Sequence, residues 1–297
     1  MLYGDLTLQK EVLQEVEQYA RNEGIKPIFG AMVGSVSQGV QYPDSDYDTR
    51  FLYLREDFPR KICIPSQMKE EELVKRYYPR DRVYEWIPFW EATSFFQFLT
   101  VPGFLNDFSV GLYNIVGWTM MSPYIWDPYG LQSKLMPLIH KIFHPAYKIA
   151  YHKGELESYR GEWGAERVIV KNYLYSVHAA ATIEWSLKYN EQPPVDLQTL
   201  LCGLRRHAVW KEAKKILEEA RKEAEKRYQE QAVDLHQSHF SILTPYNEVI
   251  EKYIRGMLDC VKEEEQAEID RSHDEEILES IYDIIYDAVF QNVKLLF

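Results

Sequence analysis

Two aspartates, Asp46 and Asp48, stand two residues apart just before an apolar stretch, and their carboxylates are the strongest chemical signal in the chain. If this segment is extended, both side chains point to the same face of a sheet. Two carboxylates on one face stay ionised comfortably only when a cation joins them. Oxygen ligands of this kind suit Mg²⁺, which takes further ligands from waters and substrate phosphates. The spacing therefore predicts a Mg²⁺ (or Mn²⁺) site on Asp46 and Asp48.

A Gly-Ser pair, Gly34 and Ser35, ends the apolar stretch that precedes these aspartates. A turn that leads from a buried strand into a short helix exposes backbone N–H groups that can hold a phosphate, and the Ser35 hydroxyl adds a donor. Gly34 allows a ligand to come close to the backbone, and Gly39 lets the chain turn before the acidic segment. Together with Ser37, these residues form a candidate nucleotide-binding turn about ten residues before the paired aspartates, as a triphosphate bound with Mg²⁺ requires.

Each part of this pattern also has a simpler explanation. A lone Gly-Ser turn is common in α/β proteins, and the acidic run from Asp44 to Asp48 is typical of a solvated loop or a helix cap. The order of apolar strand, Gly-Ser, second glycine and Asp-x-Asp is much more specific than either part. A third carboxylate from another strand would complete a two-metal arrangement, in which one ion activates the attacking oxygen and the other neutralises the leaving pyrophosphate.

The elements that must position these residues alternate between helix and strand. Residues 7–23 are predicted to form an amphipathic helix, and the apolar stretch 25–35 a buried strand that runs into the turn. Residues 49–54 are strand-like, and residues 82–91 form a second aromatic strand candidate in which a proline favours a sheet edge. We therefore predict an α+β fold, with a small mixed β-sheet flanked by helices as a catalytic domain over residues 1–110.

From about residue 105 onward the pattern becomes helical. Helical periodicity marks the segments 131–143, 145–160, 164–189, 207–232, 245–260 and 274–296. An all-helical domain is therefore predicted over residues 111–297, and it ends in an acidic C-terminal tail. From residue 261 onward the chain carries 11 acidic and 3 basic residues, a net −8 of the total −12.

Composition limits the partners and the compartment. A net charge of −12 excludes a protein that coats nucleic acid through bulk positive charge, although a local basic groove remains open. No apolar run approaches the roughly 18 residues that span a bilayer, and the N-terminus lacks the apolar core of a signal peptide. The three cysteines have no CxxC spacing, which favours the reducing cytoplasm and no structural zinc. We therefore expect a cytoplasmic protein without a membrane partner, whose oligomeric state the sequence leaves open.

The stretch from Gly34 to Leu54 resembles the signature of the DNA polymerase β-like nucleotidyltransferase superfamily. More narrowly, it is similar to the predicted nucleotidyltransferases associated with RNA ligases in bacteria and phages. Their pattern is Gly-Ser, three residues, Gly, a short spacer and then PDSDYD-x-R before an aliphatic or aromatic strand. The residues that match its second half here are Pro43, Asp44, Ser45, Asp46, Tyr47, Asp48 and Arg50. A helical K-x-x-x-Y segment that ends in Trp is resembled by Lys171, Tyr175 and Trp185, so the resemblance spans most of residues 30–200.

The resemblance implies a nucleotidyltransferase core and a metal-dependent reaction. A nucleotide would move from a nucleoside triphosphate, with ATP expected, to a hydroxyl acceptor such as RNA, and pyrophosphate would be released. Asp46 and Asp48 would be catalytic metal ligands, Lys171 would contact the triphosphate and Tyr175 would stack on the base or ribose. From the residues alone, a solvated Lys171 over a core Tyr175 fits equally well. Two alternatives stay open: a protein-modifying adenylyltransferase, and a catalytically decayed nucleotide- or RNA-binding partner of an RNA-processing system.

The third acid is where the chain departs from the family pattern. The family carries this acid four residues before a Trp that opens a helix, and that position here is Trp86. A one-residue bulge at 84–86 in the edge strand would bring the neighbouring Glu85 into line, so Glu85 is assigned as the third catalytic and metal-binding carboxylate. Glu91, next to Trp90, is the alternative.

Further features have weaker functional interpretations. The basic and aromatic run 75–82 could contact a polynucleotide backbone while its tyrosines stack on bases, and the run 205–207 is similar in charge. Such runs are more often solvated. His178 could line a cleft, although a lone helical histidine more often lies on the surface or in a hydrogen-bonded core position. No zinc site is assigned to the remaining histidine spacings, at His140, His144 and His152.

Overall fold

The chain divides into two compact units, and each is assembled from more than one stretch of sequence. In this computed structural model the described residues are 13–14, 16–18, 20–22, 24–42, 47–54, 85–89, 94–100, 121–141, 143–230, 242–262 and 274–290. The first unit takes residues 1–33, 47–142 and 270–297, and the second takes residues 34–46 and 143–269. The predicted domain boundary at 110/111 lies outside the described residues and stays a prediction.

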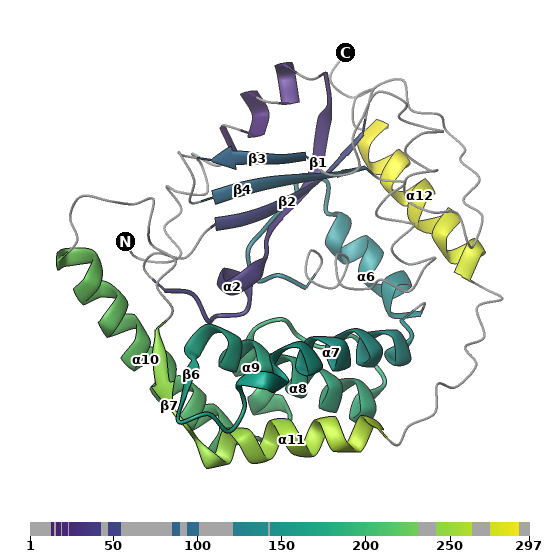
Figure 1. Cartoon of the computed structure of the whole chain (residues 1–297). Helices are drawn as coiled ribbons and strands as arrows, with labels where there is room; N and C mark the ends of the chain where they lie inside the picture. The colour runs from purple at the N-terminus through teal and green to yellow at the C-terminus, as the bar shows by residue number, and fades with distance from the viewer. Residues whose placement is uncertain are drawn as a thin grey trace. The chain divides into compact units, whose positions relative to one another are not determined.

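A five-stranded mixed sheet forms the centre of the first unit (Figure 1). Its order is β3-β4-β2-β1-β5, and β2 pairs in parallel with β4 while the other neighbours are antiparallel. The strands are β1 (Lys26–Met32), β2 (Tyr47–Leu54), β3 (Glu85–Phe89), β4 (Ser94–Thr100) and β5 (Ile125–Trp126). The sheet agrees with the predicted α+β class, and β3 with its internal proline lies at an edge, where a missing N–H donor is tolerated.

Apolar side chains anchor the two central strands of this sheet. Ile28 and Phe29 of β1 and Phe51 and Leu52 of β2 are almost completely buried. Gly30 of β1 has no side chain, and a Cβ there would collide with the ring of Phe51. Met32 at the end of β1 pairs with Thr49 near the start of β2. The residues that follow β1 therefore start next to the residues that begin β2.

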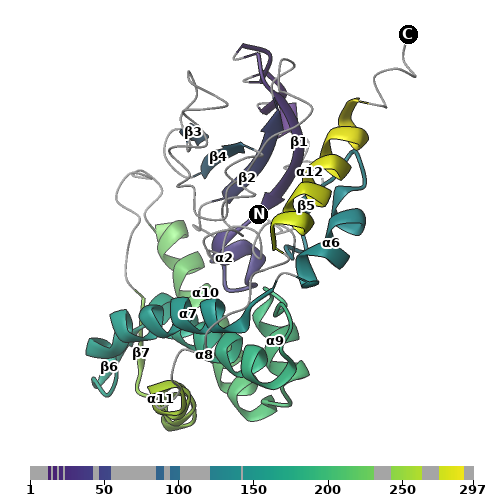
Figure 2. The same cartoon turned by 90° about the vertical axis from the view of Figure 1, so that its right-hand side faces the viewer.

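Two helices pack together in the first unit: α6 (Leu131–Lys141) and α12 (Asp274–Phe290). Figure 2 shows α12 alongside α6. Ile281 and Ile285 of α12 are buried, whereas Asp283 and Asp287 are exposed. Much of the predicted acidic tail is therefore an amphipathic helix with a core-facing side.

Helix α8 (Val170–Tyr189) is the centre of the second unit and contacts four other helices. Most of its residues are buried, and the small run Ala179–Ala181 lets its neighbours approach closely. The helices around it are α7 (Pro145–Tyr159), α9 (Leu197–Gly203), α10 (His207–Glu230) and α11 (Glu248–Lys262). The unit also contains the short helix α2 (Gly34–Ser37) and a 3-10 turn at Arg160–Glu162.

The prediction that everything after residue 110 is helical is wrong in two places. Strand β5 joins the main sheet, and β6 (Arg167–Ile169) pairs with β7 (Leu243–Pro245) as an antiparallel ribbon. These strands have two or three residues, which is too short to show an alternating pattern. Among the described residues, no helix combines the length and apolar character that crossing a bilayer requires.

Candidate functional site

The Gly-Ser turn follows β1 directly, as the sequence predicts. Helix α2 begins at Gly34, whose φ of 64° is in the left-handed region that favours glycine. The turn is closed by backbone bonds: the Gly39 N–H donates to the Val36 carbonyl at 3.2 Å, and the Val40 N–H donates to the Ser35 carbonyl at 3.0 Å. These bonds give the segment one defined backbone path.

Ser35 and Ser37 of this turn both have buried side chains. The Ser37 hydroxyl donates to the Gly34 carbonyl at 2.9 Å. Ser37 therefore stabilises the turn from inside. Its assignment to nucleotide binding, like that of Gly34, Ser35 and Gly39, stays a prediction.

A backbone hydrogen bond ties the start of the carboxylate strand to the residue before the turn. The Val33 N–H donates to the Asp48 carbonyl at 2.9 Å. Asp48 is half-buried at the beginning of β2, and Gly34 is the next residue after Val33. Asp46 lies outside the described residues. Of the two predicted metal ligands, Asp48 is thus bonded through its backbone to the residue that precedes the Gly-Ser turn in the sequence.

The register of the sheet defines which positions lie in line with Asp48. Asp48 pairs with Phe95 of β4, and Phe95 pairs with Pro88 of β3. The next position on the same face of β3 is Trp86, because side chains alternate along a strand. Neither Pro88 nor Trp86 has a carboxylate to offer.

Glu85 begins strand β3, as the predicted strand requires, and it pairs with Phe98. The pairing from Glu85 to Phe89 proceeds one residue at a time, so the described part of β3 contains no bulge. The bulge invoked at 84–86 therefore does not lie between Glu85 and Trp86. The placement of the Glu85 side chain and the whole of Glu91 lie outside the described residues, and the assignment of the third acid stays a prediction.

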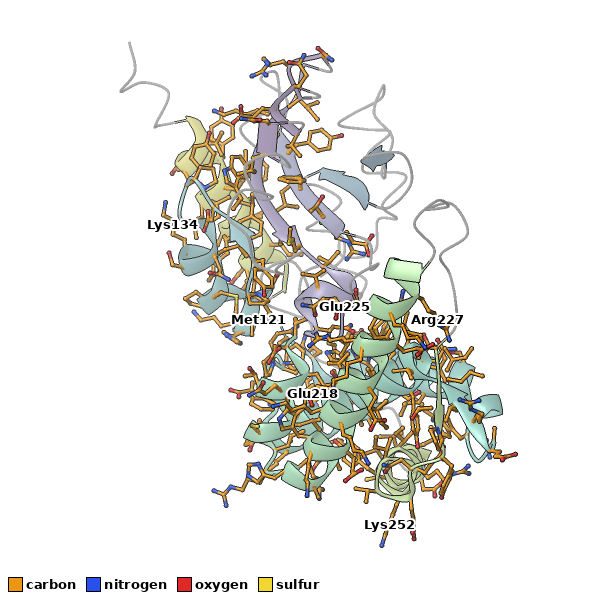
Figure 3. The ribbon with its side chains drawn as sticks, turned by 90° about the vertical axis from the view of Figure 1, so that its left-hand side faces the viewer. Met121, Lys134, Glu218, Glu225, Arg227 and Lys252 are labelled. Atoms are coloured by element: carbon orange, nitrogen blue, oxygen red, sulfur yellow. The ribbon has the colours of Figure 1, made fainter. Side chains whose placement is uncertain are left out.

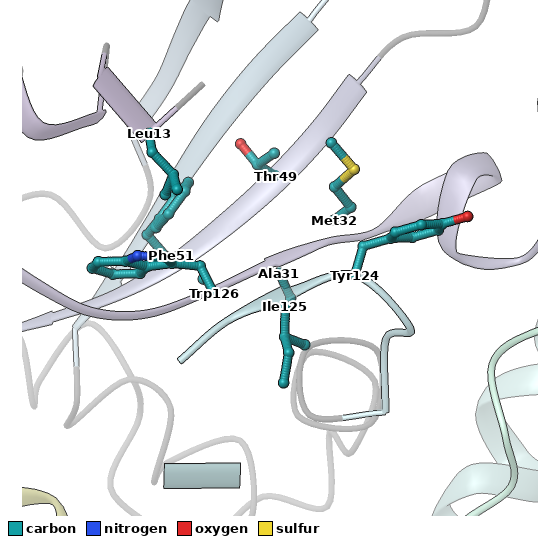
Figure 4. Close-up of a pocket in the computed structure, with 9 residues that line it drawn as sticks. Leu13, Ala31, Met32, Thr49, Phe51, Tyr124, Ile125 and Trp126 are labelled. Carbon is teal, nitrogen blue, oxygen red and sulfur yellow. The ribbon is translucent and has the colours of Figure 1, made fainter. Parts of the chain in front are cut away.

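An apolar cavity of about 80 Å³ lies on the other face of the sheet (Figure 4). Its lining includes Thr49 and Phe51 of β2 together with Ile125 and Trp126 of β5. Thr49 is the neighbour of Asp48 in the strand, so the two side chains point to opposite faces. The cavity is lined mainly by apolar groups, which makes it unsuitable for a triphosphate.

Lys171 and Tyr175 lie on one face of α8, as their spacing predicts. The Lys171 Nζ is 5.9 Å from the centre of the Tyr175 ring, within the range of a cation–π contact. Lys171 is exposed and Tyr175 is half-buried against the core of the second unit. This arrangement leaves the lysine charge accessible to solvent, and it fits both interpretations of the pair.

A buried polar cluster in the second unit, formed by three residues of α7 and one of α8, was not predicted from the sequence. The His152 Nδ1 lies 2.8 Å from the Glu155 carboxylate, and Lys148 is one turn earlier on the same helix. His178 packs 6.2 Å from His152, and its Nε2 donates to the Val195 carbonyl at 2.8 Å. The spacing of Lys148, His152 and Glu155 places their side chains on one face of a helix, and this spacing could have predicted the cluster. His178 is thus a hydrogen-bonded core histidine.

Burial controls the charge states of this cluster. It lowers the pKa of Lys148 to about 8 and the pKa of His178 to about 4. Burial likewise lowers the pKa of His152 well below its ordinary value and raises the pKa of Glu155. The two histidines are therefore neutral in the folded protein near pH 7.

We expect the melting temperature to fall by several degrees as the pH drops from 7 to 5. Between the ordinary pKa of 6.5 and the folded value of about 4, the unfolded chain binds a proton that buried His178 does not. Stability that is present above pH 6.5 is therefore lost as the pH falls toward the folded pKa. His178→Gln should have a flatter pH profile of melting temperature. An equal slope in both proteins would show that other groups cause the loss.

The two basic runs predicted from the sequence, 205–207 and 75–82, differ in what the structure describes. Arg206 donates to both carboxylate oxygens of Glu184, with its shortest contact at 2.7 Å, and Tyr253 donates to the same carboxylate at 2.9 Å. Arg206 is thus part of a protein network, in line with the simpler interpretation of this basic run. The run 75–82 lies outside the described residues. Within the part of the chain that is described, no three His, Cys, Asp or Glu side chains gather as a metal cluster.

Sequence comparison places the chain in the class of polymerase β-like nucleotidyltransferases. A family model described as "RNA repair pathway DNA polymerase beta family" matches residues 8–58 and 116–276. The chain belongs to this family, as the resemblance predicted. The match includes the turn, both aspartates and α8, but it leaves out residues 59–115, where Glu85 and Glu91 lie.

A curated relative is similar over much of its length. The chain is 21% identical over 196 residues to the uncharacterized protein YcgL of Bacillus subtilis (strain 168). This alignment covers 65% of the present chain and 69% of the relative. No solved structure matches the chain.

Proposed function

We propose that the protein transfers a nucleoside monophosphate from a nucleoside triphosphate, with ATP expected, to a hydroxyl group of RNA. The observation that carries this proposal is the bond from Val33 to Asp48, which joins the Gly-Ser turn to the carboxylate strand within one residue. Membership of a family described by RNA repair favours RNA as the acceptor.

The two proposed carboxylate ligands have the chemistry that a divalent cation requires. Asp48 offers hard carboxylate oxygens at the start of a strand, and Asp46 stands two residues earlier in the sequence. These two residues would hold Mg²⁺ or Mn²⁺, and the bound ion would supply positive charge to balance the phosphates. Ser35 and the backbone amides of the turn would bind phosphate oxygens, while Lys171 and Tyr175 would contact the triphosphate and the base.

The proposed reaction exchanges one bond for another at the α-phosphorus of the nucleotide. The acceptor oxygen bonds to this phosphorus as the bond to the bridging oxygen of the β-phosphate breaks. Pyrophosphate leaves, and the proton of the acceptor hydroxyl passes to a carboxylate base, for which Glu85 is proposed and Glu91 is the alternative. The protein contributes mainly by positioning and by charge neutralisation.

A transfer assay tests the proposal. The protein is incubated with α-labelled ATP and Mg²⁺ or Mn²⁺, and RNA with a free 3′-hydroxyl or total cell protein is supplied as the acceptor. Label on the RNA together with released pyrophosphate supports the proposal. Label on protein alone would replace it with a protein-modifying adenylyltransferase. Calorimetry in parallel should show that the metal raises the affinity for ATP at least about tenfold.

A second candidate is a binding partner that has lost catalysis. It is favoured by the sheet register, because the positions of β3 in line with Asp48 are Pro88 and Trp86. Such a protein would bind ATP and metal cooperatively but transfer no label to any acceptor. The combination of calorimetry and transfer therefore separates the two candidates.

Glu85→Gln is expected to lower turnover about 100-fold, while Glu91→Gln stays within about threefold of the wild type. Glu85 is preferred because a strand holds a carboxylate more rigidly than the helix start predicted for Glu91, although the register of β3 places position 85 on the face of the sheet opposite Asp48. Turnover and metal affinity are measured for both variants. Loss in Glu91→Gln alone would transfer the role to Glu91. Full activity in both would mean that neither is the third carboxylate.

A further inference from the structure

The segment that follows the Gly-Ser turn is held by the N-terminus of helix α9, far away in the sequence. The Leu197 N–H, at the first position of α9, donates to the Gln38 carbonyl at 3.0 Å. Asp196 caps the same helix and approaches Gly39 so closely that a Cβ there would lie 2.7 Å from its Oδ2. Val40 is buried in the hydrophobic core of the second unit. Main-chain and side-chain contacts thus fix three consecutive residues.

Arg221 of α10 completes this hold with a single guanidinium group. Its Nε donates to the Gln41 carbonyl at 2.9 Å, and its Nη2 donates to the Gly39 carbonyl at 3.2 Å. The same Nη2 lies 3.3 Å from the side-chain oxygen of Gln41, which is itself buried. A planar guanidinium can serve three acceptors in a fixed geometry, which an ammonium group cannot reproduce.

Residues 38–41 follow the phosphate-binding turn directly, so their position affects the proposed chemistry. The segment begins where the Gly-Ser turn ends, and Gln41 is five residues before Asp46 in the sequence. Movement of Gly39 would therefore disturb the phosphate-binding turn itself, since the N–H groups of Gly39 and Val40 close the turn by bonds to Val36 and Ser35. Catalysis by positioning is sensitive to such changes, because a displacement of about 1 Å can cost on the order of 100-fold in rate.

We propose that Arg221 is a positioning residue of the nucleotidyl-transfer site, a role that rests on the proposed function. It touches neither nucleotide nor metal in this assignment. It fixes the Gly39–Gln41 segment, and through that segment it holds the backbone of the phosphate-binding turn.

The test compares Arg221→Gln and Arg221→Lys with a matched control on the same helix, Arg227→Gln. Figure 3 shows Arg227 with Glu218 and Glu225 along α10, the helix that carries Arg221. The control removes an ion pair within the same helix, in which Arg227 contacts Glu223 one turn away at 2.7 Å. Hydrogen exchange is followed in peptides that cover residues 34–42, and the kcat and KM for ATP are measured separately.

Arg221→Gln should speed exchange in residues 34–42 by at least about tenfold, with unchanged exchange in α8. Its kcat should fall about 30- to 100-fold while the KM for ATP stays within about threefold. Arg221→Lys should lie between the wild type and Arg221→Gln, and Arg227→Gln should match the wild type in every measurement.

Three outcomes would contradict the positioning role of Arg221. Unchanged exchange in Arg221→Gln would overturn the hold of Arg221 on the segment. Faster exchange with the turnover of the control would overturn the positioning role. If the wild type transfers no nucleotide while exchange responds to Arg221→Gln, the proposed function and the positioning role fail together, and only the structural hold remains.

Discussion

Asp48→Asn should reduce nucleotide transfer by about 1000-fold without lowering the melting temperature. Asparagine keeps the shape of the side chain, but it removes the charge and one strong oxygen ligand from the proposed metal site. The bond between Val33 and Asp48 uses the backbone carbonyl, so the substitution leaves it intact. If Asp46 and Asp48 share a metal as proposed, their carboxylates repel each other in the metal-free protein, so removing one of them should leave the melting temperature constant or raise it.

The measurements for this variant are transfer of α-labelled ATP and thermal unfolding without metal. Asp46→Asn should behave in the same way. Asp283→Asn is the control, because Asp283 is exposed on α12 and should affect neither quantity. A drop of many degrees in Asp48→Asn would assign Asp48 a structural role in place of a catalytic one.

Gly39→Ala should lower the free energy of unfolding by about 2 to 4 kcal/mol. Gly39 has a φ of 73°, which a residue with a side chain adopts only at a cost. The new Cβ would also lie 2.7 Å from the Asp196 Oδ2. Asp196 cannot move away freely, since its Oδ1 accepts from both the N–H and the hydroxyl of Thr199 at 2.7 Å.

Urea unfolding of two other glycine variants provides the comparison. Gly154 of α7 and Gly256 of α11 are helical, and a Cβ at either position would meet nothing within 4 Å. Their replacement by alanine should therefore stabilise the protein by about 0.5 to 1 kcal/mol each. If Gly39→Ala unfolds at the same urea concentration as the wild type, the turn does not require glycine at this position.

Local sequence patterns predicted the helices that have a strong hydrophobic periodicity and the strands that have an apolar run. The helices at α7, α10 and α12 begin at the predicted residues, and Tyr47–Leu54 and Glu85–Phe89 are strands. The Gly-Ser turn was predictable because glycine and serine have specific backbone roles there. Charge alone gave a misleading description of residues 274–290, whose buried isoleucines are part of a packed helix.

Features that depend on distant pairing were not predictable from one sequence. Arg221 is separated from Gln41 by 180 residues, and no local pattern connects an arginine on a charged helix with a main-chain carbonyl. The buried cluster around His152 depends on the packing of α7 against α8 in the same way. The third acid could not be assigned from the sequence for another reason, since one residue of register decides the face on which a side chain lies.

The hold on residues 38–41 by α9 and α10 also orders events during synthesis of the chain. Gln41 leaves the ribosome 180 residues before Arg221, which corresponds to roughly 10 to 40 s at typical translation rates. During this interval β1 and β2 can pair, but the carbonyl groups of the connecting segment still face water. The bonds from Arg221 to Gly39 and Gln41 therefore form only after α10 has been made, so a nascent chain that stops at the end of the sheet lacks them.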